Sequence, residues 1–569
     1  MRSKLFAISI AVSVLALGCS DSGSSKSAKK SAAGPSLDAV SCGTLPNAKV
    51  KAGGELVDYA QLSDSGSDTS FDPAVVQTLD ESQITSAVWD GLTDFDFSEK
   101  CSPVLKPQVA ESFKPNADAS VWTFKIRSDA KFSNGEKITP STFKASWERA
   151  GSKDVASPYG YLIAYVEGGA ELQDGSATAL KGVKADDASS TLTVTLAAAN
   201  ADFASIVSHP FFGPVSKADR DRLGMTSPGW GDKGAMIGNG PFKIEKADET
   251  EVVLVPNTSW TGNVYGDKKV NLDKITIKTT VDVESAFQAF EAGDGQTATI
   301  PSGQFGPAMD KYKNTVKSPT MGAYYFDFGD SDPQLGGEKN VLLRQAISLA
   351  IDRDEINDKV YEGTRATPTG VTPPGIPGFK KGLCDYCALD VAKAKKLLKQ
   401  WTDAGGTLTE PIKIDYNEGG SHGDVVQVII SNLKKNLGID AVAAPVAENY
   451  FRDVAKEGGC HFCRSGWYAD YPTYGNFMVD LFSKASIDGN NFARFENSEF
   501  ETIIAKAQKT TDAAERGKLY NSAEDILLNK QTIVVPMNWY TGDHVYADNV
   551  VNYDQPPLGL ILWERVGLK

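Results

Sequence analysis

The chain has 569 residues, of which 41% are hydrophobic, 23% charged and 9% aromatic. This composition is typical of a soluble globular protein and excludes fibrous and wholly disordered chains. The 58 Lys and Arg residues face 73 Asp and Glu residues, so the formal net charge is -15. An acidic surface without a basic block argues against nucleic acid as the partner, because phosphate binding depends on clustered cations. The length predicts about three or four packed units.

The first residues have the pattern of an export signal. Arg2 and Lys4 precede an apolar run from Leu5 to Leu17. This run is shorter than the roughly 20 residues that cross a membrane, but it fits a signal peptide. It ends in Leu-Ala-Leu-Gly before Cys19, which resembles a bacterial lipobox, where the signal peptide is removed and a lipid is attached to the cysteine. The Ser-, Gly- and Lys-rich residues 20–35 predict a flexible tether, and a plain secretory signal is the alternative.

Six further cysteines form an even set in an exported chain, where disulfides persist. They are Cys42, Cys101, Cys384, Cys387, Cys460 and Cys463. The last four form two Cys-x-x-Cys pairs, a spacing that also occurs in four-thiolate zinc sites. The wide separation of the two pairs and the oxidising compartment favour disulfides, and a zinc site remains the alternative.

Strand and helix patterns alternate irregularly after the tether. Residues 120–127 alternate apolar and polar side chains, which predicts a half-buried strand, and residues 191–196 and 251–255 have the same pattern. Asn340 and Asp390 are each placed to cap an amphipathic helix. These elements indicate a mixed α/β chain.

A strand over 412–416, a helix over 424–437 and a strand over 439–445 predict a βαβ unit, and so a partly parallel sheet in the C-terminal half. Between the first strand and the helix, Gly-Gly-Ser-His-Gly matches the G-x-S-x-G nucleophile elbow at Ser421. A triad would need a later histidine, for which His461 and His544 are available, whereas the alternative is a turn that caps the helix. No nucleotide-binding, HExxH or EF-hand motif is present, so we expect a protein that is not an enzyme and has no cofactor.

Several separated segments, in order along the chain, resemble one family. They are Phe71–Pro73, Val88–Leu92, Val109–Ser112, Val121–Arg127, Lys131–Glu136, Gly238–Lys243, Arg344–Arg353, Gly466–Pro472 and Arg516–Glu524. Together these segments resemble the oligopeptide-binding proteins of bacterial ABC importers, solute-binding family 5, over about residues 53–569.

The resemblance implies an α/β fold of the periplasmic-binding-protein type (type II, cluster C), with two lobes joined by a hinge and an extra inserted subdomain. It also implies a monomer that encloses an oligopeptide between the lobes and delivers it to an ABC permease with its ATPase. With the N-terminal lipid, the protein would be held on the outer face of the cytoplasmic membrane. The implied boundaries are 1–18 for the signal peptide, 19–52 for the lipid-anchored linker, 53–82, 211–282 and 536–569 for lobe I, 83–210 for the inserted subdomain, and 283–535 for lobe II.

The resemblance also implies ligand-binding residues. Asp470, in the Trp-x-Ala-Asp-Tyr segment, would hold the peptide ammonium by a charge-assisted hydrogen bond. Trp467 would wall the cleft or pack in the core, and Arg464 would pair with the carboxylate of a short peptide. Tyr159 would line the cleft, and Leu79 would make a backbone contact with the ligand.

Two departures from the family pattern leave the ligand open. Cys460 and Cys463 bracket the residues just before Arg464, and Asp470 is followed by Tyr-Pro-Thr rather than by the frequent second acidic residue. A dipeptide, an oligosaccharide or a metal chelate such as a nickel complex is therefore an alternative ligand. A secreted serine hydrolase that uses Ser421 is the alternative from another class of protein.

Overall fold

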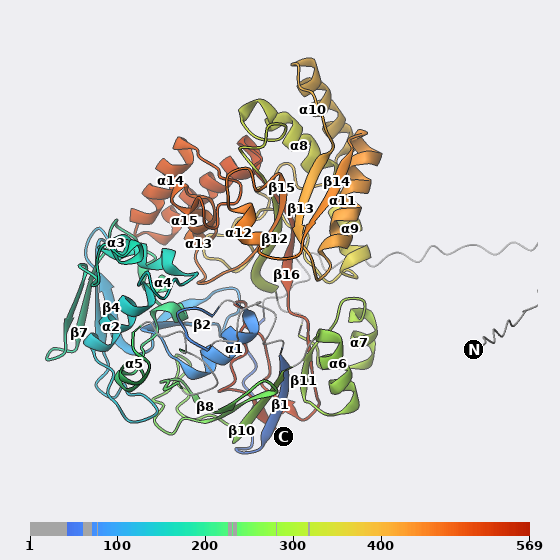
Figure 1. Cartoon of the computed structure of the whole chain (residues 1–569). Coiled ribbons are helices and arrows are strands. Elements are labelled where there is room, and N and C mark those ends of the chain that lie inside the picture. The colour runs from blue at the N-terminus through green and yellow to red at the C-terminus, as the bar shows by residue number, and fades with distance from the viewer. Residues whose placement is uncertain are drawn as a thin grey trace, which may run out of the picture.

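The computed structural model describes residues 43–60, 71–76, 78–225, 230, 236–279, 282–316 and 319–569. These residues form a five-stranded sheet and two four-stranded sheets, and a separate hydrophobic core lies against each. Figure 1 shows the five-stranded sheet and its helices above the other two sheets. The expected signal peptide and the two cysteines Cys19 and Cys42 lie outside the described residues.

We call the part of the molecule built around the sheet of strand order β1-β10-β9-β8 the lower body. Strand β1 (Glu55–Ala60) runs parallel to β10 (Lys274–Thr279). Strands β9 (Glu251–Pro256) and β8 (Phe242–Ala247) continue the sheet antiparallel. Helix α1 (Leu79–Val88) packs on this sheet. The shared core includes Leu56, Ile84, Val88, Phe242, Leu254, Ile275 and Trp563.

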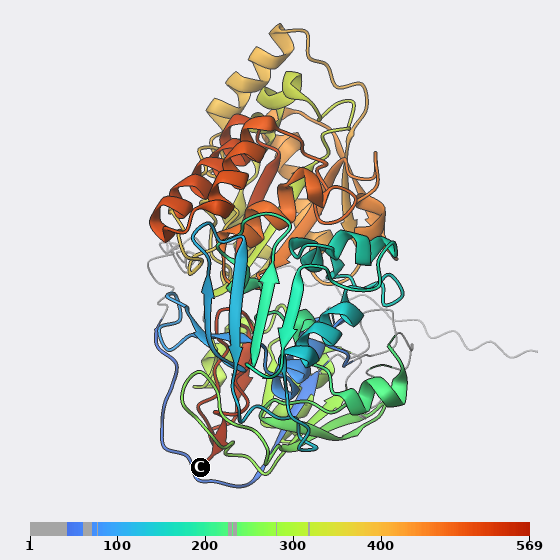
Figure 2. The same cartoon turned by 90° about the vertical axis from the view of Figure 1, so that its left-hand side faces the viewer.

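A second body, which we call the inserted body, is formed by residues between α1 and β8. It contains an antiparallel sheet of order β4-β5-β7-β6, which Figure 2 turns toward the viewer. Its strands are β4 (Ala110–Pro115), β5 (Val121–Ile126), β7 (Thr191–Thr195) and β6 (Val183–Asp186), with helix α2 (Pro140–Ala150) packed beside them. The half-buried strand predicted at residues 120–127 is confirmed. Its inward residues are Trp122, Phe124 and Ile126.

We call the part of the molecule built around the mixed sheet of order β14-β13-β15-β12-β16 the upper body. Its strands are β14 (Ala441–Val446), β13 (Ile412–Asn417), β15 (Phe462–Tyr468), β12 (Pro319–Phe328) and β16 (Val534–Thr541). β13 is parallel to both β14 and β15, whereas β12 is antiparallel to both β15 and β16. All ten residues of β12 are buried, so this strand forms the centre of the upper core.

The predicted βαβ unit is confirmed, because α11 (His422–Leu437) joins the parallel strands β13 and β14. Asp390 caps α10 (Val391–Asp403) as predicted, accepting a hydrogen bond from the Lys393 N–H at 2.9 Å. Asn340 is the N-cap residue of α8 (Val341–Ala350) as predicted, but its side chain makes no capping hydrogen bond. Its Oδ1 accepts the indole N–H of Trp401 at 3.0 Å instead, because a buried indole needs a hydrogen-bond partner.

The chain passes between the lower and the upper body through two neighbouring segments. The Val316 N–H donates to the His544 carbonyl at 2.8 Å, and Pro319 of β12 pairs with Thr541 of β16. The chain therefore enters the upper body after Val316 and leaves it after Thr541. We name these two segments the crossings.

The crossings differ in place from the lobe boundaries expected at residues 282/283 and 535/536. Helix α6 (Val283–Ala292) and strand β11 (Thr297–Thr299) stay with the lower body. Phe287 and Phe290 of α6 are buried against Val545, and β11 pairs with β17 (His544–Tyr546). The apolar face of α6 is thus covered by the lower body, and β16 is held by its pairing with β12 in the upper one.

Disulfide bonds join Cys384 to Cys387 and Cys460 to Cys463, with Cα–Cα distances of 5.5 Å and 5.2 Å. Cys101 is disulfide-bonded as well. The two Cys-x-x-Cys pairs therefore have no free thiolates to offer to zinc. Over the part of the chain that the structure describes, there is no group of three or more His, Cys, Asp or Glu that could hold a metal ion. None of the helices in that part has the length and apolarity to span a membrane.

Candidate functional site

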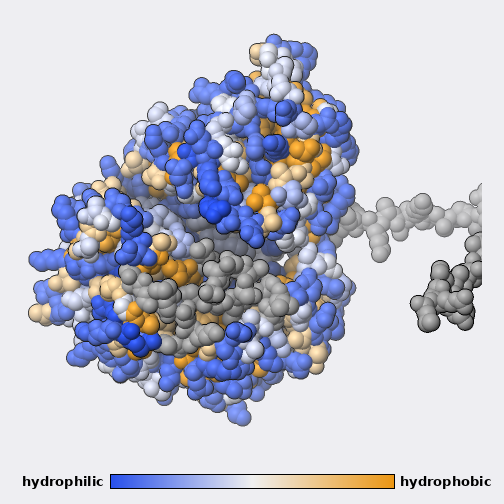
Figure 3. All heavy atoms as spheres, viewed as in Figure 1, coloured by the Kyte–Doolittle hydropathy of each residue, from blue (hydrophilic) through white to orange (hydrophobic). Residues whose placement is uncertain are grey.

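The surface is hollowed where the upper and lower bodies meet, as Figure 3 shows. A cavity of about 140 Å³ there is lined by Asp470 of the upper body and by Trp89, Asp90 and Leu560 of the lower body. Asp470 lies in the loop between β15 and α13 (Tyr474–Phe482). The residue predicted to hold the ligand ammonium therefore lines a cavity between two bodies.

Asn476 holds the loop that carries Asp470. Its Oδ1 accepts hydrogen bonds from the Asp470 N–H at 3.0 Å and from the Trp467 indole N–H at 2.9 Å. Its Nδ2 donates to the carboxylates of Asp470 at 3.1 Å and Asp480 at 2.9 Å. Asn476 is 0% exposed, so its four hydrogen bonds fix the Asp470 carboxylate without competition from water.

The inserted body completes the surroundings of the Asp470 carboxylate. The Tyr161 hydroxyl donates to Oδ2 at 2.6 Å, and Nε2 of His209 lies 4.0 Å from Oδ1. Burial lowers the pKa of His209 to about 3, so this imidazole is neutral and supplies no positive charge. Among the described residues, no Lys or Arg forms an ion pair with Asp470.

Burial raises the pKa of Asp470 to about 7, against the hydrogen bond from Tyr161, and the nearby Asp480 raises it further. The side chain of Asp470 is 11% exposed. A buried carboxylate with neutral donors alone favours a cation as its missing partner. The ammonium group of a ligand would supply that charge.

Three more carboxyl groups line the same cavity, from Asp90, Asp94 and Glu564. Burial raises the pKa of Asp90 to about 8 and that of Asp94 to about 7, and it also raises the pKa of Glu564. The Trp260 indole N–H donates to Asp90 at 2.9 Å. The cavity is therefore lined by carboxyl groups, apolar side chains and neutral polar residues, and it has no lysine or arginine in its lining.

Trp467 supports the site indirectly, through Asn476. Its ring packs against the upper core, and its indole N–H holds Asn476. Trp467 is half-buried, so its packing against the core leaves the predicted role as a wall of the cleft a prediction. Tyr159 packs against His209, with ring centroids 4.4 Å apart, and Nε2 of His209 lies 4.0 Å from the Asp470 carboxylate.

Arg464 lies farther along β15, between aromatic rings. Its guanidinium carbon is 5.0 Å from the centroid of Tyr324 and 5.7 Å from that of Phe451. Nη1 donates to the Asn417 side chain at 3.3 Å, and Nε has no hydrogen-bond partner. A carboxylate would fit such a guanidinium, and the Cys460–Cys463 disulfide directly precedes it.

Leu79 is the first residue of α1 and lines a second cavity between the bodies, of about 220 Å³, together with Tyr468 of β15. Thr78 and Glu81 form a capping box that begins this helix. The predicted backbone contact of Leu79 with a ligand would be made from this helix start. Tyr468, the last residue of β15, lines the cavity of Leu79, and Asp470, in the loop that follows, lines the first one, so the end of β15 lies beside both cavities.

The G-x-S-x-G segment lies between β13 and α11 as the motif requires, but no triad is assembled there in the described chain. The Ser421 hydroxyl is 3.4 Å from the Ser302 hydroxyl. The two later histidines have other partners, since His461 is 3.0 Å from Asp415 and His544 is 3.2 Å from Asp543.

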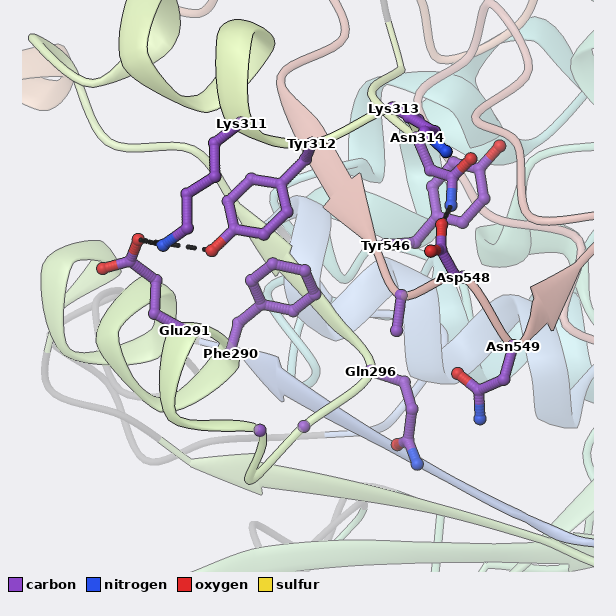
Figure 4. Close-up of a pocket in the computed structure, with 13 residues that line it drawn as sticks. Phe290, Glu291, Gln296, Lys311, Tyr312, Lys313, Asn314, Tyr546, Asp548 and Asn549 are labelled. Carbon is purple, nitrogen blue, oxygen red and sulfur yellow. Dashed lines mark hydrogen bonds and ion pairs between the residues drawn. The ribbon is translucent and has the colours of Figure 1, made fainter.

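A third and larger cavity, of about 460 Å³, lies away from these residues, between α6, α7 (Phe305–Lys311) and the end of β17. Figure 4 shows Phe290 and Tyr312 on one side and Tyr546 on the other. Among its charged groups, Lys311 pairs with Glu291 at 2.8 Å, and Asp548 accepts a hydrogen bond from Asn314 at 2.9 Å. None of the predicted ligand-binding residues lines this cavity.

Sequence reasoning missed Tyr161, His209 and Asn476. Tyr161 lies two residues after Tyr159, but the sequence does not indicate which tyrosine hydroxyl in this stretch reaches a carboxylate. Asn476 occupies a helix N-terminus, where an asparagine is ordinary. No signal in the sequence marked His209.

We expect Asn476→Ala to lower the free energy of unfolding by about 2–4 kcal/mol, because it leaves buried donors and acceptors without partners. Urea unfolding of the ligand-free protein measures this. Asn436→Ala is the matched control, since Asn436 is half-buried and its amide makes one hydrogen bond, to the Ala350 carbonyl. Equal losses in the two variants would contradict the role given to Asn476.

The fold and the site define a protein that encloses a solute between two bodies. Residues 104–489 match the family described as bacterial extracellular solute-binding proteins, family 5 Middle. The match covers more than half of the chain, and the chain belongs to this family.

Individual relatives share most of its length. The periplasmic oligopeptide-binding protein OppA of Escherichia coli is 29% identical over 520 residues, which are 89% of this chain and 92% of that protein. The dipeptide-binding protein DppE of Bacillus subtilis is 27% identical over 524 residues, which are 90% and 92%. The solved structure of Haemophilus influenzae OppA in complex with RPPGFSPFR has a TM-score of 0.73 and 25% identity, covering 91% of this chain and 100% of that one. The predicted family and the periplasmic-binding-protein fold are thereby confirmed.

Proposed function

We propose that this protein is the substrate-binding receptor of an ABC importer and captures oligopeptides by their free N-terminus. The observation that carries the proposal is the buried Asp470 carboxylate, which is held by Asn476 and Tyr161 and has no cationic partner among the described residues. An α-ammonium group placed there would gain charge-assisted hydrogen bonds in a site of low dielectric. The names of the relatives, which are oligopeptide- and dipeptide-binding proteins, support the same ligand class.

The receptor would work by closing around the ligand and releasing it to the permease and its ATPase. The lower and inserted bodies would form the first lobe, and the upper body would form the second. The adjacent crossings support a hinge, because two neighbouring connections leave one axis for rotation. The protein would act as a monomer without covalent chemistry, exported and anchored by a lipid on Cys19.

Native mass spectrometry of the protein produced without its lipid anchor tests the ligand class. We expect co-purified peptides of mixed sequence with free N-termini in the natural protein and their loss in Asp470→Asn. A defined oligosaccharide or a metal chelate in place of peptides would contradict the proposal and favour the corresponding alternative.

The alternative of a serine hydrolase is tested at Ser421. We expect Ser421→Ala to leave peptide affinity within about twofold, because the hydroxyl contacts Ser302 and lines neither cavity between the bodies. Calorimetry measures the affinity, and a chromogenic ester series measures turnover in the same preparations. Ester turnover that disappears in Ser421→Ala would establish the hydrolase.

A further inference from the structure

The inserted body contacts helices α14 (Ser498–Lys509) and α15 (Ala513–Asp525) of the upper body, which lie above it in Figures 1 and 2. The Ala201 N–H donates to the Gln508 carbonyl at 2.7 Å. Next to it, Asp202 Oδ1 lies 3.2 Å from Nε of Arg516. None of these residues lines the cavity of Asp470 or that of Leu79. These contacts therefore join the two bodies without lining the space for a ligand.

A further contact joins the inserted body to α13 of the upper body. The Tyr165 hydroxyl donates to Asp480 Oδ1 at 2.5 Å. Tyr165 lies four residues after Tyr161, which donates to Asp470. Asn476 donates to the carboxylates of both Asp470 and Asp480. The contact at Asp480 is therefore linked, through one buried side chain, to the carboxylate that would hold the ligand ammonium.

The inserted body is fixed to the lower body by a buried ion pair. Arg149 of α2 donates from Nη1 to Asp72 Oδ1 at 2.9 Å, and both residues are 2% exposed. The guanidinium carbon of Arg149 also lies 3.7 Å from the ring centroid of Trp230, which belongs to the lower core. Breaking one partner from a buried ion pair is costly. We therefore expect the inserted and lower bodies to move together when the upper body moves about the crossings.

Arg516 is held in place by the upper body itself. Its Nη1 donates to the carbonyl of Thr510 at 2.8 Å and to that of Thr511 at 3.3 Å, which leaves Nε to face Asp202. The side chains of Arg516 and Asp202 are 18% and 9% exposed, so salt screens this ion pair less than one on the open surface. Because the guanidinium is already ordered, little conformational entropy is lost when Asp202 reaches it.

We propose that Asp202 and Arg516, together with the hydrogen bonds of Ala201 and Tyr165, form a latch that holds the receptor closed and so sets the rate at which it releases its ligand. The latch rests on the proposed function, because closure around a peptide is taken from it. The inserted body thereby acts in the release of the ligand and not only in its recognition.

The latch acts on release because of the order of events. A ligand enters while the bodies are apart, and the contacts of Asp202 and Tyr165 with the upper body form only when the bodies meet. Opening then requires these contacts to break before the ligand can leave. Loss of the latch therefore raises the dissociation rate and leaves the association rate almost unchanged, as is common for contacts formed after the encounter.

Stopped-flow fluorescence on the protein produced without its lipid anchor tests the latch, with tetraalanine that carries fluorescein at its C-terminus as the probe. Mixing measures association, and a chase with unlabelled tetraalanine measures release. We expect Asp202→Asn and Arg516→Gln each to release the peptide about tenfold faster, as for a hydrogen bond between charged groups, with association changed by less than about twofold. The double variant releases it no faster than either single variant, because both remove the same ion pair.

Two further variants support the measurement. Tyr165→Phe keeps the ring and removes the hydroxyl, and we expect release about threefold faster, as for the loss of one hydrogen bond. Asp129→Asn is the matched control, because Asp129 pairs with Arg127 at 3.0 Å within the inserted body. It retains the natural rates of association and release.

The outcomes separate the two proposals. If the labelled peptide does not bind the natural protein, the proposed function is wrong, and the latch with it. If the peptide binds and both Asp202→Asn and Tyr165→Phe release it at the natural rate, the latch is wrong and the peptide receptor stands. Release from the double variant that is about 100-fold faster would also contradict the latch, because Asp202 and Arg516 would then act independently.

Discussion

Asp470→Asn is expected to weaken the binding of a tri- or tetrapeptide about 100-fold. The variant keeps the size of the side chain and a hydrogen-bond acceptor, but it removes the charge that an α-ammonium would meet in a buried site. Removing one partner of a buried, hydrogen-bonded charge pair costs roughly 2–5 kcal/mol, which corresponds to this loss. Isothermal titration calorimetry on protein freed of ligand by partial unfolding and refolding measures it.

Asp327→Asn is the matched control for this loss. Asp327 is also a buried carboxyl group of the upper body, hydrogen-bonded by Ser465, and burial raises its pKa to about 7, as for Asp470. It lines neither cavity between the bodies. We expect this variant to bind peptides like the natural protein, and an equal loss in the two variants would show that general stability, and not the ammonium contact, was measured.

Peptide affinity is expected to rise with pH between about 5 and 7 and to level off above 7. In the ligand-free protein the pKa of Asp470 is raised to about 7, so the group is protonated below that pH. A bound ammonium favours the ionised form, and the complex therefore holds fewer protons than the free protein below pH 7. Raising the pH then favours binding, by up to tenfold per pH unit while one proton is released.

Calorimetry at pH 6 in two buffers with different ionisation enthalpies counts the protons that leave on binding. Asp90, Asp94 and Asp480 lie near the site with raised pKa values, about 8, 7 and 6, and contribute to the total. The difference between the natural protein and Asp470→Asn isolates the proton of Asp470. A binding reaction that releases equal numbers of protons in both would contradict the assignment of the ammonium to Asp470.

Local elements of the fold could be predicted because their signals are local. The alternation around Trp122 and Phe124 and the strand–helix–strand order over 412–445 need only the sequence within each segment. Asn340 occupies the predicted N-cap position, but its side chain makes no capping hydrogen bond because it accepts one from a distant residue, Trp401. The crossings lie elsewhere than the expected lobe boundaries because the partners that hold α6 and β16 are far along the chain.

The candidate site could be predicted only in part, for a similar reason. Asp470, Trp467 and Arg464 lie within one segment, and a family resemblance was enough to select them. The donor that reaches the Asp470 carboxylate, Tyr161, lies 309 residues earlier in the chain, and no sequence pattern links the two. Asn476 is six residues away, yet its four hydrogen bonds become visible only when the loop folds back on α13.

The late return of the chain to the lower body has a consequence for secretion. Both cores need residues from the last 36 positions, Val534 and Val535 in the upper one and Trp563 and Val566 in the lower one. A chain that crosses a membrane N-terminus first presents these residues last. Neither core can be completed before these late segments have crossed, so the order of the sequence would delay the folding of both bodies during export.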